Sequence, residues 1–301
     1  MHIFIVNPIA GSGNSKAAVP IIEKTMKSAG VRYSFIYTEK PDDFARVNAR
    51  INELAGAQPV DSIVCVGGDG TAQEYLKAAI DRGVPFGIIP AGSANDFLYS
   101  IPGAAKKFRS FEDKISYYTE KIIRGETKRI DAVSLNGENC FINIGGTGID
   151  IQVLIDAIPL KKYLAGGAYF ISLIKNAVTY KDEKFKLTID GKEESGEYLL
   201  LAICNGSFYG GHLRVAPTAV ADDGMLTLCV ATKMPRLKRA AVFPLVKPGW
   251  HNRLNEVSFI NCESFILEFD GAKIINLDGN LKEFRSPLKF DILKGAVRFI
   301  V

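Results

Sequence analysis

The residues best suited to chemistry form the segment 67–71, in which three glycines surround Asp69 and precede a threonine. A mostly apolar, β-branched run at 63–66 comes before it, and a helical pattern begins at Ala72. Glycines permit positive φ and leave room for a ligand, while the N–H groups at a helix start attract anions. The segment therefore predicts a phosphate-binding turn. An ordinary tight turn, which needs only one glycine, is the alternative.

Two further predicted strands, at 3–6 and 85–90, are also followed by glycine-bearing polar turns. The polar and glycine residues of these two turns are Asn7, Gly11, Ser12, Gly92, Ser93, Asn95 and Asp96. Strands that alternate with helices indicate a parallel sheet, and such sheets bind ligands beyond the carboxyl ends of their strands. We therefore expect all three turns to lie along one edge of a single sheet.

The pattern of elements changes near Gly125. Beyond it come many short predicted strands joined by hairpin-type turns such as Asn136-Gly137 and Asp190-Gly191, with one helical segment at about 151–180. Short strands with regular turn signals predict an antiparallel sandwich or barrel. The chain is therefore expected to hold two domains of different architecture, which suits its length of 301 residues.

Composition narrows the class of function. The net charge of +4 is too small to argue for nucleic acid and is compatible with anionic ligands or an anionic membrane surface. Five widely spaced cysteines, an odd number, are typical of reduced thiols in a cytoplasmic protein, and scattered histidines argue against a zinc site. No apolar run approaches the ~20 residues that span a bilayer, and we see no secretory signal. Contact with lipid would therefore be peripheral.

The ordered motifs resemble the diacylglycerol kinase catalytic-domain family, in particular bacterial soluble lipid kinases, and are also similar to sphingosine kinases. The resemblance covers essentially the whole chain. Its motifs lie at Asn7-Pro8 to Gly11, 67–71, 90–97, 141–150, 205–211 and 216–226.

The resemblance implies a two-domain fold. An α/β nucleotide domain at 1–126, with a parallel sheet like that of NAD kinases and 6-phosphofructokinases, would precede a C-terminal antiparallel β-sandwich domain at 127–287 that takes the lipid substrate. The last strand, at 288–301, would return to the first domain. ATP would bind in the cleft between the domains.

The resemblance also implies the residues that bind ATP and Mg²⁺. The positions that match its nucleotide site are Asn7, Gly11, Ser12, Thr38, Gly67, Gly68, Asp69, Gly70, Thr71, Glu74 and Ser93. Ser93 replaces a usual threonine and keeps the hydroxyl group, and Gly92, Asn95 and Asp96 belong to the same turn. Val220, Asp223 and Met225 match a structural magnesium site with two main-chain carbonyl ligands, a set that suits a hard cation.

The catalytic candidates are Asp69, Asp278 and Asn280. Asp69, with little apolar cover predicted, is expected to stay ionised and to act on metal or nucleotide, unless it only stabilises its turn. The family usually carries a glutamate as general base where this chain has Asn280, and an amide is no useful proton acceptor. Three interpretations stay open: Asp278 or Asp69 acts as the base, transfer needs little base assistance, or the protein binds nucleotide without transfer. Asp278 could also be a simple hairpin residue.

The motifs and the resemblance together predict an ATP- and Mg²⁺-dependent kinase. The resemblance alone implies that the acceptor is a diacylglycerol-like or sphingoid-like lipid at the membrane surface. The alternatives are a NAD kinase or phosphofructokinase-like enzyme, and a nucleotide-binding regulatory protein favoured by Asn280. A homodimer is compatible with the sequence. The basic segment 233–239, followed by Phe243, Leu245 and Trp250, is typical of membrane-surface segments, although solvated charge beside core residues explains it equally well.

Overall fold

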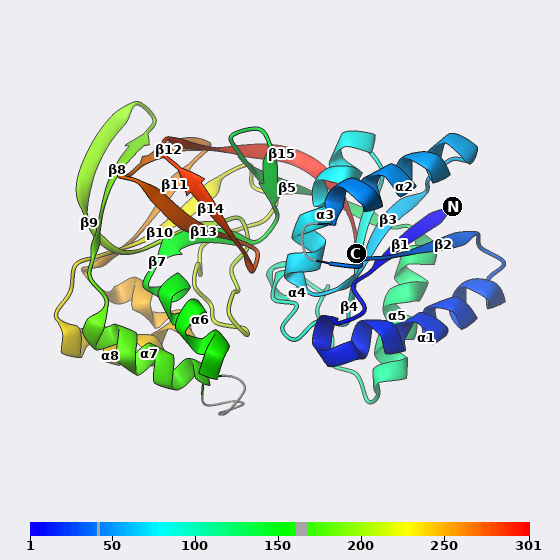
Figure 1. Ribbon diagram of the computed structural model, residues 1–301, viewed down its shortest axis with the longest axis horizontal. Coiled ribbons are helices and arrows are strands. Elements are labelled where there is room, and N and C mark those ends of the chain that lie inside the picture. The colour runs from blue at the N-terminus through cyan, green and yellow to red at the C-terminus, as the bar shows by residue number, and fades with distance from the viewer. Residues whose placement is uncertain (41–42, 161–167) are drawn as a thin grey trace. The chain divides into compact units, whose positions relative to one another are not determined.

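The computed structural model describes residues 1–40, 43–160 and 168–301, and it divides into two compact units (Figure 1). Unit 1 comprises residues 1–132 and 293–301, and unit 2 comprises residues 133–292. Strands β5 (Thr127–Leu135) and β15 (Leu288–Ile300) each have one part in unit 1 and the other in unit 2. The division therefore falls within these two strands, whereas the sequence-based boundaries stand at their starts.

Unit 1 alternates strands with helices. Its elements are β1 (His2–Val6), the 3-10 turn η1 (Ala10–Gly13), α1 (Asn14–Ser28), β2 (Tyr33–Tyr37), α2 (Phe44–Ala57), β3 (Ser62–Gly67), α3 (Asp69–Arg82), β4 (Phe86–Pro90), α4 (Phe97–Ser100) and α5 (Phe111–Arg124).

The sheet of unit 1 is parallel, with strand order β4-β3-β1-β2, and β15 pairs beside β4 through Phe299 and Phe86. Every residue of β1, β3 and β4 is buried, as continuous apolar runs in a covered parallel sheet require. Helices α2 and α3 lie on one face and α1 and α5 on the other (Figure 1). The strand order reverses between β1 and β3, which is where sheets of this kind bind ligands.

Unit 2 is mainly antiparallel. Its elements are β6 (Asn139–Phe141), β7 (Ile144–Gly148), α6 (Ile149–Leu160), α7 (Ala168–Thr179), β8 (Glu183–Ile189), β9 (Lys192–Cys204), β10 (Leu226–Thr232), α8 (Arg236–Val246), the 3-10 turn η3 (Trp250–Arg253), β11 (Val257–Cys262), β12 (Ser264–Glu268), β13 (Ala272–Leu277) and β14 (Asn280–Arg285).

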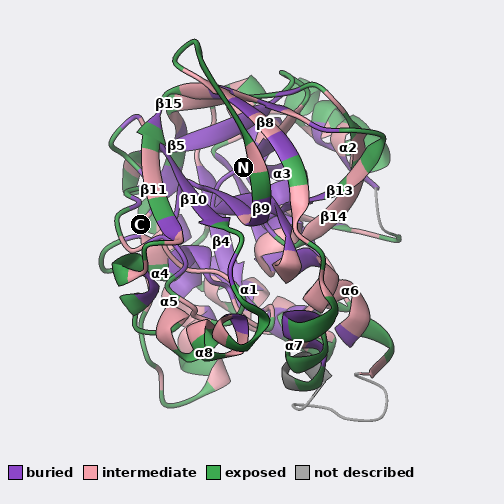
Figure 2. Ribbon diagram, turned by 90° about the vertical axis from the view of Figure 1, so that its left-hand side faces the viewer, coloured by how far each residue is buried: buried purple, intermediate pink, exposed green. Residues whose placement is uncertain are grey.

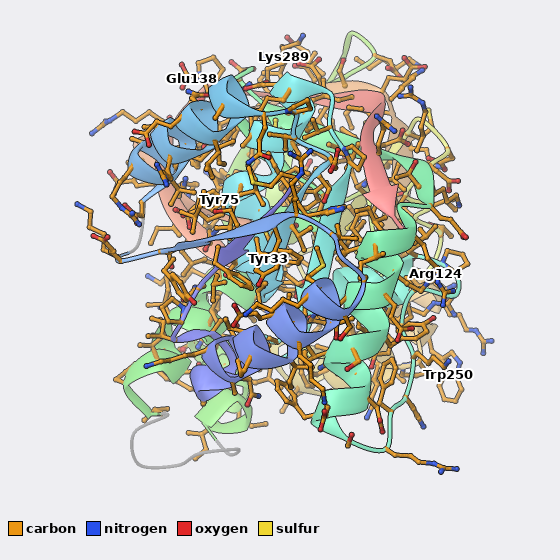
Figure 3. All side chains as sticks on the ribbon, turned by 90° about the vertical axis from the view of Figure 1, so that its right-hand side faces the viewer. Tyr33, Tyr75, Arg124, Glu138, Trp250 and Lys289 are labelled. Atoms are coloured by element: carbon orange, nitrogen blue, oxygen red, sulfur yellow. The ribbon has the colours of Figure 1, made fainter. Side chains whose placement is uncertain are left out.

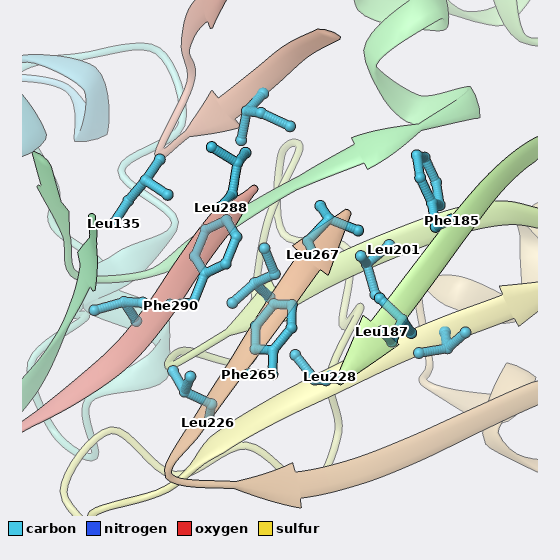
Figure 4. Close-up of a cluster of buried hydrophobic side chains, with 14 of the residues drawn as sticks. Leu135, Phe185, Leu187, Leu201, Leu226, Leu228, Phe265, Leu267, Leu288 and Phe290 are labelled. Carbon is cyan, nitrogen blue, oxygen red and sulfur yellow. The ribbon is translucent and has the colours of Figure 1, made fainter. Parts of the chain in front are cut away.

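The strands of unit 2 follow the order β14-β13-β7-β9-β8-β12-β15, and β10 joins β9 to β11. Alternate residues of these strands point into one apolar cluster (Figure 4). At its centre Phe265 and Phe290 stack with ring centroids 4.8 Å apart. The fold is therefore the predicted one, an α/β unit with a parallel sheet and an antiparallel β-sandwich.

Some local predictions differ from the structure. The predicted helical segment at about 151–180 contains two helices, α6 and α7, while its residues 161–167 lie outside the described part of the chain. Helix α8 and strand β14 were not predicted. The hairpin turns at Asn136-Gly137 and Asp190-Gly191 are confirmed, with positive φ at all four residues. Within the described ranges, no helix is both long enough and apolar enough to cross a bilayer.

Candidate active site

The turn between β1 and α1 is left-handed at three successive residues, with φ of +59° at Gly11, +56° at Ser12 and +95° at Gly13. Residues with a side chain seldom adopt this region, so the surroundings must hold Ser12 there. A Cβ atom on Gly11 would lie 2.0 Å from the main-chain oxygen of Ala91, in the turn after β4. Only glycine allows these two turns to approach so closely.

The turns after β3 and β4 also meet through their backbones. A Cβ atom on Gly92 would lie 2.3 Å from the Cα atom of Gly68. The N–H groups of Ala91 and Gly92 donate to the carbonyl oxygen of Gly67 at 3.1 and 2.9 Å. The side-chain amide of Asn95 donates to the same oxygen at 2.9 Å. Gly67 and Gly68 therefore form a backbone junction with the third turn.

A side-chain contact joins the first turn to the second. The Asn7 amide donates to the Thr71 hydroxyl at 3.2 Å. Helix α3 begins at Asp69 with Gly68 as its N-cap, and no side chain caps it. The structure thus brings the three glycine turns together at the carboxyl ends of β1, β3 and β4, as the sequence predicts. Their shared surface consists of backbone, with the positive end of α3 in it.

Asp69 is more enclosed than the sequence predicts. Its carboxylate accepts hydrogen bonds from the N–H groups of Asp96 at 2.9 Å and Phe97 at 3.2 Å, at the start of α4. Burial raises the pKa of Asp69 to about 6, although these N–H donors act in the opposite direction. The carboxylate is therefore mainly ionised at neutral pH, and it also fastens the third turn to the second.

The remaining predicted nucleotide positions lie around this junction. Thr38 follows β2 and donates its N–H to the Val6 carbonyl at 2.9 Å, which extends the pairing of β1 with β2. Glu74 is half-buried in α3, and Ser93 is exposed in the third turn. Thr38 and Ser93 thus each follow a strand of the same sheet.

Asp278 has an unexpected set of partners in unit 2. Its buried carboxylate accepts hydrogen bonds from three successive backbone N–H groups, those of Ile142 at 2.8 Å, Asn143 at 3.0 Å and Ile144 at 2.8 Å. Because both oxygens already accept strong donors, this geometry supports the hairpin interpretation of Asp278 over a role as proton acceptor.

Asn280 follows the same turn. Asp278 and Gly279 have φ of +49° and +100°, as the two-residue turn of a β-hairpin requires, and Asn280 pairs with Leu277 across it. Asn280 is half-buried. The amide therefore occupies a defined position at the start of β14, directly after a turn that the Asp278 carboxylate anchors.

The predicted metal ligands share one turn before β10. Asp223 is exposed and one of its carboxylate oxygens accepts the N–H of Met225 at 3.0 Å, while Gly224 has a φ of +75°. A carboxylate and the main-chain carbonyls of Val220 and Met225 are hard oxygen donors of the kind Mg²⁺ and Ca²⁺ prefer. The residues present are thus chemically suited to the implied ion.

Asp150 has no predicted role, although it lies in the motif at 141–150. Within the described part of the chain, the buried Oδ1 atom of Asp150 has no hydrogen-bond partner, and burial raises the pKa of this carboxyl to about 6. The signal in the sequence was an acid placed directly after apolar and glycine residues. A buried carboxyl group of this kind is costly and is unusual outside functional sites.

Comparison with known proteins finds a matching family domain for each part of the chain. The diacylglycerol kinase catalytic domain matches residues 1–135, and the YegS C-terminal NAD kinase beta sandwich-like domain matches residues 145–301. The two domains in this order define a class of lipid kinases. The chain belongs to this diacylglycerol kinase family, together with the YegS-like lipid kinases.

Relatives match most of the chain. A diacylglycerol kinase of Mycobacterium tuberculosis is 28% identical over 96% of this chain and 90% of its own length. A protein named as a YegS-like lipid kinase, from Yersinia enterocolitica, is 30% identical over 73% of this chain and 70% of its own. The crystal structure of a diacylglycerol kinase from Bacillus anthracis superposes with a TM-score of 0.75 at 24% identity, covering 99% of this chain and 96% of the other. The structural likeness supports the fold.

The contacts of Asp278 predict a structural effect of the substitution Asp278→Asn. An amide would turn one N–H donor toward the N–H groups of residues 142–144, and we expect a loss of about 2–3 kcal/mol in the unfolding free energy of unit 2. Urea unfolding followed by the fluorescence of the single tryptophan, Trp250 in unit 2, measures it. The matched control is Asp270→Asn, because Asp270 also precedes a glycine in a turn but is exposed. Equal stabilities of the two variants would contradict the anchoring role.

The raised pKa of Asp69 predicts a pH-dependent stability difference. The carboxyl releases its proton near pH 3.8 in the unfolded chain and near pH 6 in the folded chain. The contribution of this carboxyl to the unfolding free energy is therefore complete below pH 3.8 and is lost as the pH rises through 6. Relative to Asp69→Asn, the wild type should lose about 2–3 kcal/mol between these limits. Unfolding followed by circular dichroism checks this, and parallel pH profiles of the two proteins would refute it.

Proposed function

We propose that this protein transfers the γ-phosphate of ATP to a hydroxyl group of a diacylglycerol-like or sphingoid-like lipid at a membrane surface. The observation that carries the proposal is the junction of three glycine turns in unit 1, where Cβ atoms on Gly11 and Gly92 would collide with neighbouring backbone. Family membership supports phosphoryl transfer to lipid, and the junction supports a nucleotide phosphate as the donor.

The junction suits a chain of phosphates for electrostatic reasons. Successive left-handed residues from Gly11 to Gly13 turn neighbouring N–H groups in similar directions, which forms an anion-binding concavity. The uncapped start of α3 adds a helix dipole. Some N–H groups of the turns hold the junction together: those of Ala91 and Gly92 donate to Gly67, and those of Asp96 and Phe97 donate to Asp69. Phosphate oxygens would bind beside them, at the left-handed turn and the start of α3, which would orient the nucleotide.

The charge of the phosphates also calls for a divalent cation. Mg²⁺ bound with ATP would neutralise charge on the transferring group when it is present. The turn that contains Val220, Asp223 and Met225 would hold a second, structural cation with one carboxylate and two carbonyl oxygens. That cation would fix the loop before β10.

The proton of the lipid hydroxyl needs a different acceptor from the one the family uses. Asn280 is an amide, and the oxygens of Asp278 are engaged with N–H groups. The pKa of Asp69, about 6, suits a general base at neutral pH, but both of its oxygens also accept backbone N–H groups, from Asp96 and Phe97. A loose phosphoryl transition state also asks little of a base, so positioning and charge carry most of the rate.

The substitution Gly92→Ala tests the nucleotide site. Its Cβ would push the third turn away from Gly68, and we expect ATP affinity to fall at least about tenfold, or about 1.4 kcal/mol. Titration calorimetry with ATP and Mg²⁺ measures the dissociation constant. Gly56→Ala in α2, where a new Cβ meets no atom within 4 Å, is the control. A folded Gly92→Ala variant with wild-type affinity would remove the basis of the proposal.

The substitution Asn280→Glu tests the catalytic assignment. A carboxylate at this position would restore a proton acceptor, and we expect turnover to rise at least about tenfold, since general bases contribute about 10²–10⁴. The assay follows transfer of labelled phosphate from ATP to diacylglycerols, sphingoid bases and NAD. The control is Asn280→Gln, which has the same length and no charge.

The outcomes of that assay separate the alternatives. ATP binding without transfer by either wild type or Asn280→Glu would support a regulatory nucleotide-binding protein instead. Transfer to NAD in place of lipid would support the NAD kinase alternative.

A further inference from the structure

Among the described side chains of helix α7 in unit 2, two polar ones are buried and three large apolar ones are exposed. Ser172 and Asn176 are 0% and 2% exposed, whereas Ile171, Ile174 and Val178 are 45%, 44% and 51% exposed. The three apolar residues have spacings of three and four, so they form one stripe along the helix. A helix that only served the core would have the opposite orientation.

Polar contacts explain the orientation of α7. The Ser172 hydroxyl donates to the Val153 carbonyl of α6 at 2.7 Å, and the Asn176 amide donates to the carboxylate of Asp156 at 2.9 Å. Lys175 and Gln152 bind the same carboxylate at 2.8 and 2.9 Å. Helices α6 and α7 are thus joined by a polar network, and among the described residues the apolar stripe of α7 stays exposed.

Helix α8 repeats the pattern. Its one buried residue is Arg239, whose guanidinium donates to both oxygens of Asp182 at 2.9 and 2.8 Å and to the Tyr180 carbonyl at 2.8 Å. Leu237, two residues earlier, is 91% exposed. A charged anchor therefore holds α8 in place while a leucine faces outward. Few soluble surfaces expose large apolar groups in a contiguous patch without a binding role.

The three helices form one layer. Helix α7 packs against both α6 and α8, and all three lie together on one side of the strands of unit 2 (Figure 1). In Figure 2 the ribbons of α7 and α8 both carry exposed stretches, drawn in green. We call Ile171, Ile174, Val178 and Leu237 the helical surface.

The segment that contains α8 is basic, and acidic residues of neighbouring elements lie against part of it. The segment 233–253 contains six lysines and arginines and no acidic residue. Three of these cations pair with acids elsewhere in unit 2. Those that form no such pair within the described residues are Arg236, Lys247 and Arg253, and all three are exposed. Arg236 also lines an open hollow of about 650 Å³, which is shared by Lys181, Lys233 and the acids Asp182 and Glu197.

We propose that the helical surface docks unit 2 on an anionic phospholipid bilayer, with its apolar side chains among the acyl chains and the unpaired cations at the headgroups. This inference rests on the proposed function, because a lipid kinase must reach a substrate that resides in the bilayer. Apolar anchors bordered by cations are the composition of interfacial segments. The basic segment of the sequence belongs to this surface through α8.

The charge favours a bilayer over a second copy of the chain. A two-fold dimer through this surface would place the same patch on both sides of the interface and bring like charges together. An anionic bilayer instead attracts every unpaired cation.

Binding to vesicles tests the proposal. The double variant Ile174→Ser/Leu237→Ser should bind vesicles of phosphatidylcholine and phosphatidylglycerol at least about tenfold more weakly than wild type, because two exposed anchors lose their burial in lipid. Arg236→Gln/Lys247→Gln should lose about fivefold per cation, and only on the anionic vesicles. Co-sedimentation measures both. Trp250, 55% exposed just after α8, stands clear of the ribbon in Figure 3 and reports binding by its fluorescence.

The control is Ile274→Ser, an isoleucine on β13 that is 38% exposed and should bind as wild type does. Circular dichroism establishes that each variant is folded, which exposed sites allow. Absence of wild-type binding, or equal binding by the Ile174→Ser/Leu237→Ser variant, overturns the proposal. So does a wild-type dimer, seen by light scattering, that this variant dissociates.

A parallel assay separates this proposal from the proposed function. Phosphorylation of a short-chain diacylglycerol dissolved in water requires no bilayer, and the helical-surface variants should retain it at wild-type rates. If no lipid is phosphorylated while vesicle binding follows the expected pattern, the proposed function fails and the docking surface stands. If soluble substrate is phosphorylated but vesicles are not bound, the reverse holds.

Discussion

The backbone contact between Gly68 and Gly92 is the constraint on which unit 1 depends. Strands β3 and β4 are neighbours in a fully buried parallel sheet, so the turns at their ends must share the space above it. A methyl group on Gly92 would lie 2.3 Å from Gly68, and one on Gly11 would lie 2.0 Å from Ala91. The turns above the sheet therefore meet mainly through peptide groups, with the side chains of Asn7, Asp69 and Thr71 among them. The positive end of α3 begins here, which is why anions suit the site.

In unit 2 the corresponding constraint is the Asp278 carboxylate, a side chain, whereas in unit 1 it is the absence of side chains at glycines. The residues that meet at Asp278 are about 135 positions away in the chain, and three N–H groups would have no partner without this carboxylate. Asn205 completes the arrangement by donating to the Ile142 carbonyl at 2.7 Å. Because Asp278 holds the hairpin, the residue at 280 can change from an acid to an amide without loss of the turn.

The features that could be predicted from the sequence are those that arise from neighbouring residues. The three glycine turns follow apolar strands directly, so their meeting at one sheet edge follows from the parallel arrangement. The partners of Asp278 could not be predicted from the sequence, because an Asp-Gly pair is explained by a hairpin turn without any distant contact. The cover over Asp69 comes from α4, whose position depends on tertiary packing. Helix α8 contains Pro244 and a run of cations, which hides its helical pattern.

Two helices of unit 2, α7 and α8, carry residues that lower the stability of the isolated unit. Burying Arg239 beside Asp182 carries a desolvation cost that apolar residues would avoid. Leu237, 91% exposed, forgoes about 1.5–3 kcal/mol of transfer free energy, and Ile174, 44% exposed, forgoes about half as much. If only the stability of the isolated unit were selected, apolar residues on the inner side of these helices and polar residues on the outer side would remove both costs. Sequences depart from local consistency mainly where function requires it. An outward apolar face is therefore best explained by a surface that covers it, and the nearby cations indicate that this surface is anionic.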